Sequence, residues 1–119
     1  VLEATVPYTA LALSDLIGYS PKEAVSVDTA EAMAAACLRR ATRLSDEDTA
    51  IAGVACTAAL VTDRQRRGEN RAHIAVATLS GVTSSNVALD KGLRDRAAED
   101  RIVSDAVLQM IATAAKVTD

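Results

Sequence analysis

The chain has 119 residues, half of them hydrophobic, with a formal net charge of −3 and a pI of about 5.1. This length suits one domain with a single core, and the acidic balance offers no general attraction to nucleic acid or to anionic lipid. No apolar run reaches the roughly 20 residues that cross a bilayer, and no signal peptide is visible, so we expect a cytoplasmic protein with no nucleic-acid or membrane partner. Because the chain begins at Val1 and not at methionine, we also expect residues to precede it.

The amino-terminal part of the sequence predicts a short strand followed by a short helix. Leu2–Tyr8 is rich in β-forming residues. Thr9–Ile17 has apolar residues at helical spacing, and Gly18 can end this helix by adopting a left-handed conformation. Thr9 is either the N-cap of this helix or a ligand contact.

A longer helix is expected next, beginning at Ser26 or Asp28 and running to about Leu44. Asp28 and Glu31 have the spacing of a capping box, in which each side chain bonds the other's backbone N–H. The apolar stripe of this helix should consist of Ala30, Met33, Cys37, Ala41 and Leu44. Three arginines, Arg39, Arg40 and Arg43, should lie on its solvated side.

The second half of the sequence predicts strands and a final helix. Ala50–Cys56 is a continuous run of small apolar residues, which is typical of a strand buried on both faces. Arg71–Leu79 alternates as a strand does, Ser80-Gly81 forms a tight connection, and Ser84–Leu89 pairs back as a hairpin. Leu93–Lys116 is the longest predicted helix. This order of elements predicts an α/β domain of three α/β/α layers with a mixed sheet.

The residues that most often carry chemistry are sparse. Cys37 and Cys56 each lie among small apolar residues, so we expect two reduced, buried thiols, with a disulfide or a reactive thiol as the alternative. His73 is the single histidine; it should face away from Ile74, and we expect it to be structural or exposed. Without a Cys/His cluster, the sequence predicts no metal site and no cofactor.

Four ordered segments give the chain a resemblance to a known family. They are Val6-Pro7-Tyr8-Thr9 with Leu16-Ile17-Gly18; Ala24-Val25-Ser26 with Ala30-Glu31-Ala32-Met33-Ala34; Ala52-Gly53-Val54-Ala55-Cys56-Thr57; and Gly68 to Val76. In this order they resemble the CinA C-terminal family of nicotinamide-nucleotide amidases. The chain is most similar to a divergent branch of that family, resembling the segment that precedes nucleotidylyltransferase-like domains in some larger proteins. The resemblance implies the three-layer fold and a pyridine-nucleotide ligand.

The chain departs from the family where the chemistry should lie. The family has a Tyr-Ser-Asn-x-x-Lys motif, whose lysine serves a catalytic serine; here the tyrosine is Tyr8 but the lysine position is Leu13. A leucine cannot exchange a proton. The Gly-Pro of the family's substrate loop is replaced by Cys56-Thr57, and the family's serine turn would precede Val1.

These matches and departures define the candidate site residues. Tyr8 is either a vestigial catalytic residue or a half-buried ring that closes a loop. Gly53, Cys56 and Thr57 are expected at a strand end that binds substrate, although Gly53 could equally serve only close packing. Arg64 and Arg67, in an arginine-rich loop, could contact a phosphate or simply be solvated. The expected binding set therefore consists of Thr9, Gly53, Cys56, Thr57, Arg64 and Arg67.

Two functional interpretations follow from the sequence. In the first, the chain is a catalytically incomplete, amidase-like binding, regulatory or oligomerisation module. In the second, it is an active amidohydrolase that deamidates nicotinamide mononucleotide, with its serine nucleophile upstream of Val1 and another residue in place of the lysine. Leu13 favours the first. The resemblance also implies that the family's first strand and first helix precede Val1. A chain that lacks its first strand should expose a sheet edge or an apolar patch, so we also expect a homodimer.

Overall fold

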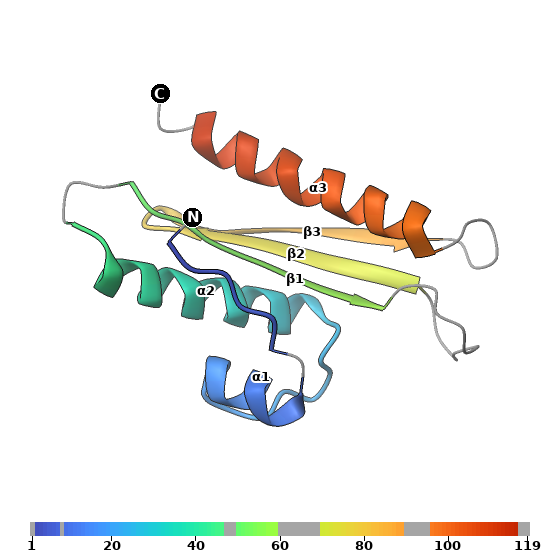
Figure 1. Cartoon of the computed structure of the whole chain (residues 1–119), viewed down its shortest axis with the longest axis horizontal. Coiled ribbons are helices and arrows are strands. Elements are labelled where there is room, and N and C mark those ends of the chain that lie inside the picture. The colour runs from blue at the N-terminus through green and yellow to red at the C-terminus, as the bar shows by residue number, and fades with distance from the viewer. Residues whose placement is uncertain (1, 8, 47–49, 60–69, 90–95, 117–119) are drawn as a thin grey trace.

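The computed structural model describes residues 2–7, 9–46, 50–59, 70–89 and 96–116. It is a small α/β domain with three helices and a three-stranded antiparallel sheet (Figure 1). The first helix, α1 (Ala10–Ile17), confirms the sequence prediction. Thr9 caps it by accepting a hydrogen bond from the Ala12 amide at 3.0 Å, and Gly18 ends it with a φ of 89°.

The long helix α2 (Val27–Leu44) begins directly after Ser26, whose side chain caps it. Asp28 therefore lies in the first turn and is not the cap. The predicted apolar stripe is largely confirmed by the buried Ala30, Met33 and Ala41. Leu44 was wrongly included: it is 45% exposed at the carboxyl end of the helix.

The sheet consists of β1 (Gly53–Ala59), β2 (Asn70–Thr78) and β3 (Gly81–Leu89), in that order. Both neighbouring pairs are antiparallel, so the expectation of a mixed sheet is wrong for the described strands. The hairpin between β2 and β3 is confirmed, and Gly81 leaves its turn with a φ of 137°. The tight turn between β2 and β3 requires antiparallel pairing of those two strands, because parallel strands need a long crossover connection.

Two further strand predictions, for Leu2–Tyr8 and for Ala50–Cys56, need correction. Residues 2–7 form no strand, although Leu2–Tyr8 is rich in β-forming residues; Tyr8 itself lies outside the described residues. Instead, Glu3 of this segment forms an ion pair with Arg40 of α2 at 3.0 Å. The strand β1 begins at Gly53 and not at Ala50, and only its α2 side is fully buried.

Residues from the two faces of the sheet enter two separate core clusters. On the α2 face, Ala55, Ala75 and Ala77 pack with residues of both amino-terminal helices, namely Leu13, Ile17, Ala30, Met33 and Ala34. On the other face, Ala72 and Leu89 pack with Val103 of α3 (Arg96–Lys116). Alternation along β2 accounts for this division, because successive side chains point to opposite faces.

Small residues allow α2 to lie very close to the sheet. A β-carbon built on Gly53 would collide with backbone atoms of α2 at Ala34 and Leu38. Gly53 therefore satisfies a packing requirement, which is one of the two roles that its sequence context predicts. The core is built of alanines rather than aromatic residues for the same reason: large side chains would force the helix and the sheet apart.

Candidate functional site

The carboxyl end of β1 meets the amino-terminal end of α2. Thr57 is buried, and its hydroxyl donates a hydrogen bond to the carbonyl oxygen of Ser26 at 3.4 Å. Ser26 is the cap of α2, so this contact joins the strand end to the start of the helix. The sequence had predicted a site at this strand end, and Thr57 does lie there, but its hydroxyl is already engaged with the protein.

A second contact ties β2 to the same place. Arg71 donates a hydrogen bond from Nη2 to the carbonyl oxygen of Val25 at 3.1 Å, and the same nitrogen is 3.9 Å from a carboxylate oxygen of Glu23. The arginine thus holds the segment that leads into α2. Arg71 lies in β2, directly after the arginine-rich loop that the sequence singled out; Arg64 and Arg67 of that loop lie outside the described residues.

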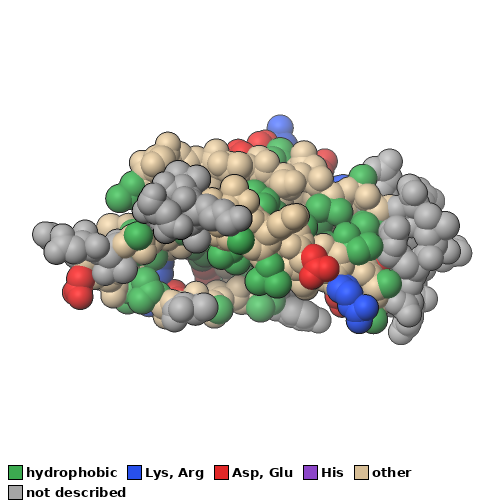
Figure 2. Space-filling model, turned by 90° about the horizontal axis from the view of Figure 1, so that it is seen from above, with side chains coloured by type: hydrophobic (Ala, Val, Ile, Leu, Met, Phe, Trp, Pro, Cys, Tyr) green, Lys and Arg blue, Asp and Glu red, His purple; other side chains and the backbone are tan. Residues whose placement is uncertain are grey.

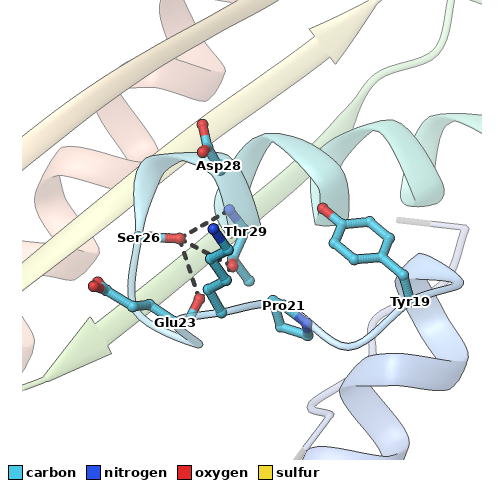
Figure 3. Close-up of a pocket in the computed structure, with 7 residues that line it drawn as sticks. Tyr19, Pro21, Glu23, Ser26, Asp28 and Thr29 are labelled. Atoms are coloured by element: carbon cyan, nitrogen blue, oxygen red, sulfur yellow. Dashed lines mark hydrogen bonds between the residues drawn. The ribbon is translucent and has the colours of Figure 1, made fainter.

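The hydroxyls at the α2 cap form a closed network (Figure 3). The Ser26 hydroxyl accepts from the Thr29 amide at 3.1 Å and lies 3.0 Å from the Thr29 hydroxyl. Thr29 Oγ1 in turn donates to the carbonyl oxygen of Glu23 at 2.6 Å. The bond from the Thr29 amide satisfies one of the first backbone donors of the helix, and neither hydroxyl donates to a base that could activate it as a nucleophile.

Beside this network lies an open pocket of about 370 Å³. Its lining comes from the linker before α2 and from the first turn of that helix, and comprises Tyr19, Pro21, Lys22, Glu23, Ser26, Asp28 and Thr29. Figure 3 shows the Tyr19 ring on one side and the Glu23 side chain on the other, with Pro21 between them. Tyr19 is 52% exposed, so its ring can meet a ligand from solvent.

The chemistry of this lining suits binding better than bond cleavage. Lys22 supplies a positive charge, Glu23 and Asp28 supply negative charges, and Tyr19 supplies a flat ring. Acyl transfer needs a nucleophile within reach of a base, and an oxyanion site. The serine and threonine hydroxyls of the lining are hydrogen-bonded to each other, to a backbone amide and to a carbonyl oxygen, and none of these partners is a base that could activate them.

Sequence reasoning missed this pocket. The Tyr19-Ser20-Pro21 turn and the Ser26 cap were both visible in the sequence, but a turn and a cap separated by several residues do not reveal that they enclose a cavity. What brings them together is the return of the chain from α1 to α2, which depends on tertiary packing.

The other predicted binding residues are distributed over the fold. Thr9 caps α1, as one of its two predicted roles required. Cys56 lies on the opposite face of the sheet from Thr57, because neighbouring strand residues alternate, and it packs against the Ala72–Leu89–Val103 cluster. Tyr8 lies outside the described residues. Of the expected binding set, therefore, only Thr57 contacts the α2 cap among the residues that can be placed.

The two thiols behave as small hydrophobic groups. Both are free and half-buried. Burial raises the pKa of Cys56 above its ordinary value of 9.0, and burial together with the negative charge of Glu3 does the same for Cys37. Each thiol is therefore protonated at neutral pH and is a poor nucleophile.

His73 lies on the α2 face, opposite to Ile74 as predicted. Its Nδ1 is 2.7 Å from the side-chain oxygen of Asn86, its cross-strand neighbour on β3. Within the described part of the chain no three His, Cys, Asp or Glu residues come together as a metal site. No described helix is long and apolar enough to span a membrane.

The fold and the pocket define a small α/β domain with a cavity of mixed charge beside the start of α2. No protein-family model matches the chain, and no curated protein or solved structure matches it either. The resemblance to nicotinamide-nucleotide amidases is accordingly a hypothesis that rests on sequence motifs alone.

Proposed function

We propose that the chain is a catalytically incomplete, amidase-like domain that binds a pyridine nucleotide or regulates a larger protein, on a three-layer scaffold related to the CinA C-terminal family. The observation that best supports this proposal is the position of Leu13. The motif resemblance gives this position to the catalytic lysine, and here the side chain is only 7% exposed and packs in the core with Ile17 and Met33. A buried leucine supplies neither a base nor a charge.

The pocket beside the α2 cap is the best-supported binding site. Its mixture of one lysine, two carboxylates and an exposed tyrosine ring favours a ligand that carries charges of both signs over a simple polyanion. Nicotinamide mononucleotide is such a ligand, with a cationic pyridinium ring and a phosphate. An aromatic face attracts a cation, and an ammonium group binds phosphate.

Two features of the binding site predicted from the sequence support the pocket beside the α2 cap as the ligand site. Thr57 and Arg71 both anchor the segment that forms the pocket wall, and Arg71 lies in β2, directly after the arginine-rich loop. We propose that Arg64 and Arg67, which lie outside the described residues, contact the ligand phosphate. These arginines would then act together with Lys22 on the anionic end of the ligand.

Calorimetric titration with nicotinamide mononucleotide tests the proposal. We expect measurable binding at millimolar ligand, weakened about five-fold by Lys22→Ala because an exposed charged hydrogen bond contributes about 1 kcal/mol. Tyr19→Ala should weaken it by a similar factor. Arg39→Ala is the matched control: it also removes one positive charge, but from the solvated side of α2, and should leave affinity unchanged.

The outcome also distinguishes the proposed ligand from simpler ones. Ribose 5-phosphate, which lacks the pyridinium ring, should bind more weakly than the full nucleotide. Absence of heat with the unmutated protein at millimolar nucleotide would contradict ligand binding and leave a structural or oligomerisation role. Equal effects of Lys22→Ala and Arg39→Ala would place the site away from this pocket.

A further inference from the structure

We propose that the free edge of β3 is a self-association surface, on which β3 of a second copy pairs antiparallel about a two-fold axis at Ser85. The sequence predicts a homodimer only in general terms. The structure adds a particular surface, because β3 is the outer strand of the sheet β1-β2-β3. This inference is independent of the ligand proposed above.

Within β3 itself, the sequence carries none of the features that normally prevent strand addition. Proteins protect a free edge with charged residues, proline, a bulge or a very short strand. The nine residues of β3, Gly81–Leu89, include no charge and no proline, and they pair with β2 in an unbroken register from Asn70↔Leu89 to Thr78↔Gly81. Along this strand, alternate N–H and C=O groups point outward, where no described strand receives them.

The strand is also accessible from both sides. All residues from Gly81 to Asn86 are exposed, so α2 and α3 leave room for a partner strand to approach. The strand β1 is the other edge of the described sheet. It is shorter, with seven residues, and its side chains are mostly buried or half-buried. The longer and more exposed β3 edge is therefore the better template.

The sequence of β3 complements itself in one register. A two-fold axis perpendicular to the sheet keeps the two copies' equivalent faces on the same side, and centring it on Ser85 is the arrangement that pairs all nine residues. Ser84 then lies opposite Asn86 of the second copy, Val82 opposite Ala88, and Thr83 opposite Val87. Polar residues meet polar ones, Val82 meets an apolar residue, and Thr83 and Val87 are both β-branched. Such cross-strand pairs stabilise a sheet, and no like charges oppose each other.

The exposed hydrophobic residues of α3 are a weaker candidate for the contact. Ile102, Leu108 and Ile111 are at least one-third exposed, but they do not form one stripe at helical spacing. Seen from the α3 side, hydrophobic side chains lie in several separate spots (Figure 2). The continuous feature is the strand edge.

Strand pairing alone buries less than the roughly 800 Å² per partner of a typical stable complex. We therefore expect a weak dimer, with a dissociation constant on the order of tens of micromolar. Sedimentation velocity from about 1 to about 500 µM should show a concentration-dependent shift from monomer to dimer.

Charge substitutions at the two-fold axis give the decisive test. Ser85→Lys and Ser85→Glu each place like charges opposite one another, and each should raise the dissociation constant about five-fold or more. An equimolar mixture of the two variants pairs opposite charges and should restore dimerisation to the unmutated level or beyond. Thr42→Lys, on the exposed side of α2, is the control and should have no effect. Circular dichroism checks that every variant is folded.

Several outcomes would overturn the proposal. A monomer throughout this concentration range would do so, as would a dimer that Ser85→Lys leaves intact or that Thr42→Lys weakens equally. Two folded charge variants that fail to associate on mixing would also contradict pairing about Ser85. Loss of the dimer with Ala58→Lys but not with Ser85→Lys would assign the contact to β1 instead.

Discussion

The substitution Gly53→Ala adds a single methyl group, and it should destabilise the domain more than the small size of that group suggests. The new β-carbon would meet the carbonyl oxygen of Ala34, the amide nitrogen of Leu38 and, at 3.1 Å, the carbonyl carbon of Cys37. All three are backbone atoms in the middle of α2, so no flexible side chain can move aside. Either the helix or β1 must shift, and overpacking of this kind costs about 1–3 kcal/mol.

Urea denaturation followed by circular dichroism measures this cost. For a domain of this size, each kcal/mol corresponds to about 4 °C in melting temperature. Gly81→Ala is a useful comparison, because its β-carbon would meet nothing within 4 Å while the backbone φ of 137° disfavours alanine. We expect Gly53→Ala to be the more destabilising of the two. A loss below about 0.5 kcal/mol would refute the close approach of β1 and α2.

Three further predictions concern stability. Leu13→Lys should lower the free energy of unfolding by more than about 3 kcal/mol, since it removes buried apolar area and introduces a charge into the core. Leu13→Met should lower it by less than about 1.5 kcal/mol. Equal urea midpoints for the two variants would contradict the buried position of Leu13. Ser26→Ala should cost about 1 kcal/mol through loss of the helix cap, and an unchanged urea midpoint would show that the cap network is not formed. Burial raises the pKa of Cys37 and Cys56, so their contribution to stability is complete below their ordinary pKa of 9.0 and is lost as pH rises through their folded values. The free energy of unfolding should therefore fall less steeply above pH 9 in a Cys37→Ala, Cys56→Ala double variant than in the unmutated protein, and identical slopes would count against the burial of these thiols.

Local signals predicted much of the fold. Thr9, Gly18 and Ser26 act through backbone bonds within a few residues, so their caps and helix ends could be read from the sequence. The alternation along β2 likewise predicted that His73 faces away from Ile74. These features depend on neighbouring residues and not on distant contacts.

The features that depend on tertiary packing were harder to predict. Strand direction is set by how the connections pass over the sheet, and the order of elements suggested a mixed sheet that the described strands do not form. The sequence placed Cys56 and Thr57 in one site, yet strand alternation puts them on opposite faces. The pocket at Tyr19 depends on the path between two helices, which no local pattern reveals.

The most direct test of the proposed function is ammonia release from nicotinamide mononucleotide by the protein, with any segment that precedes Val1 present. The burial of Leu13 at the expected lysine position, and the engagement of the Ser26 and Thr29 hydroxyls in a helix cap, predict no release above a buffer blank. Turnover above about 0.1 per second, near the low end of ordinary enzymes, that disappears when an upstream serine is replaced would contradict the account and establish an active amidohydrolase.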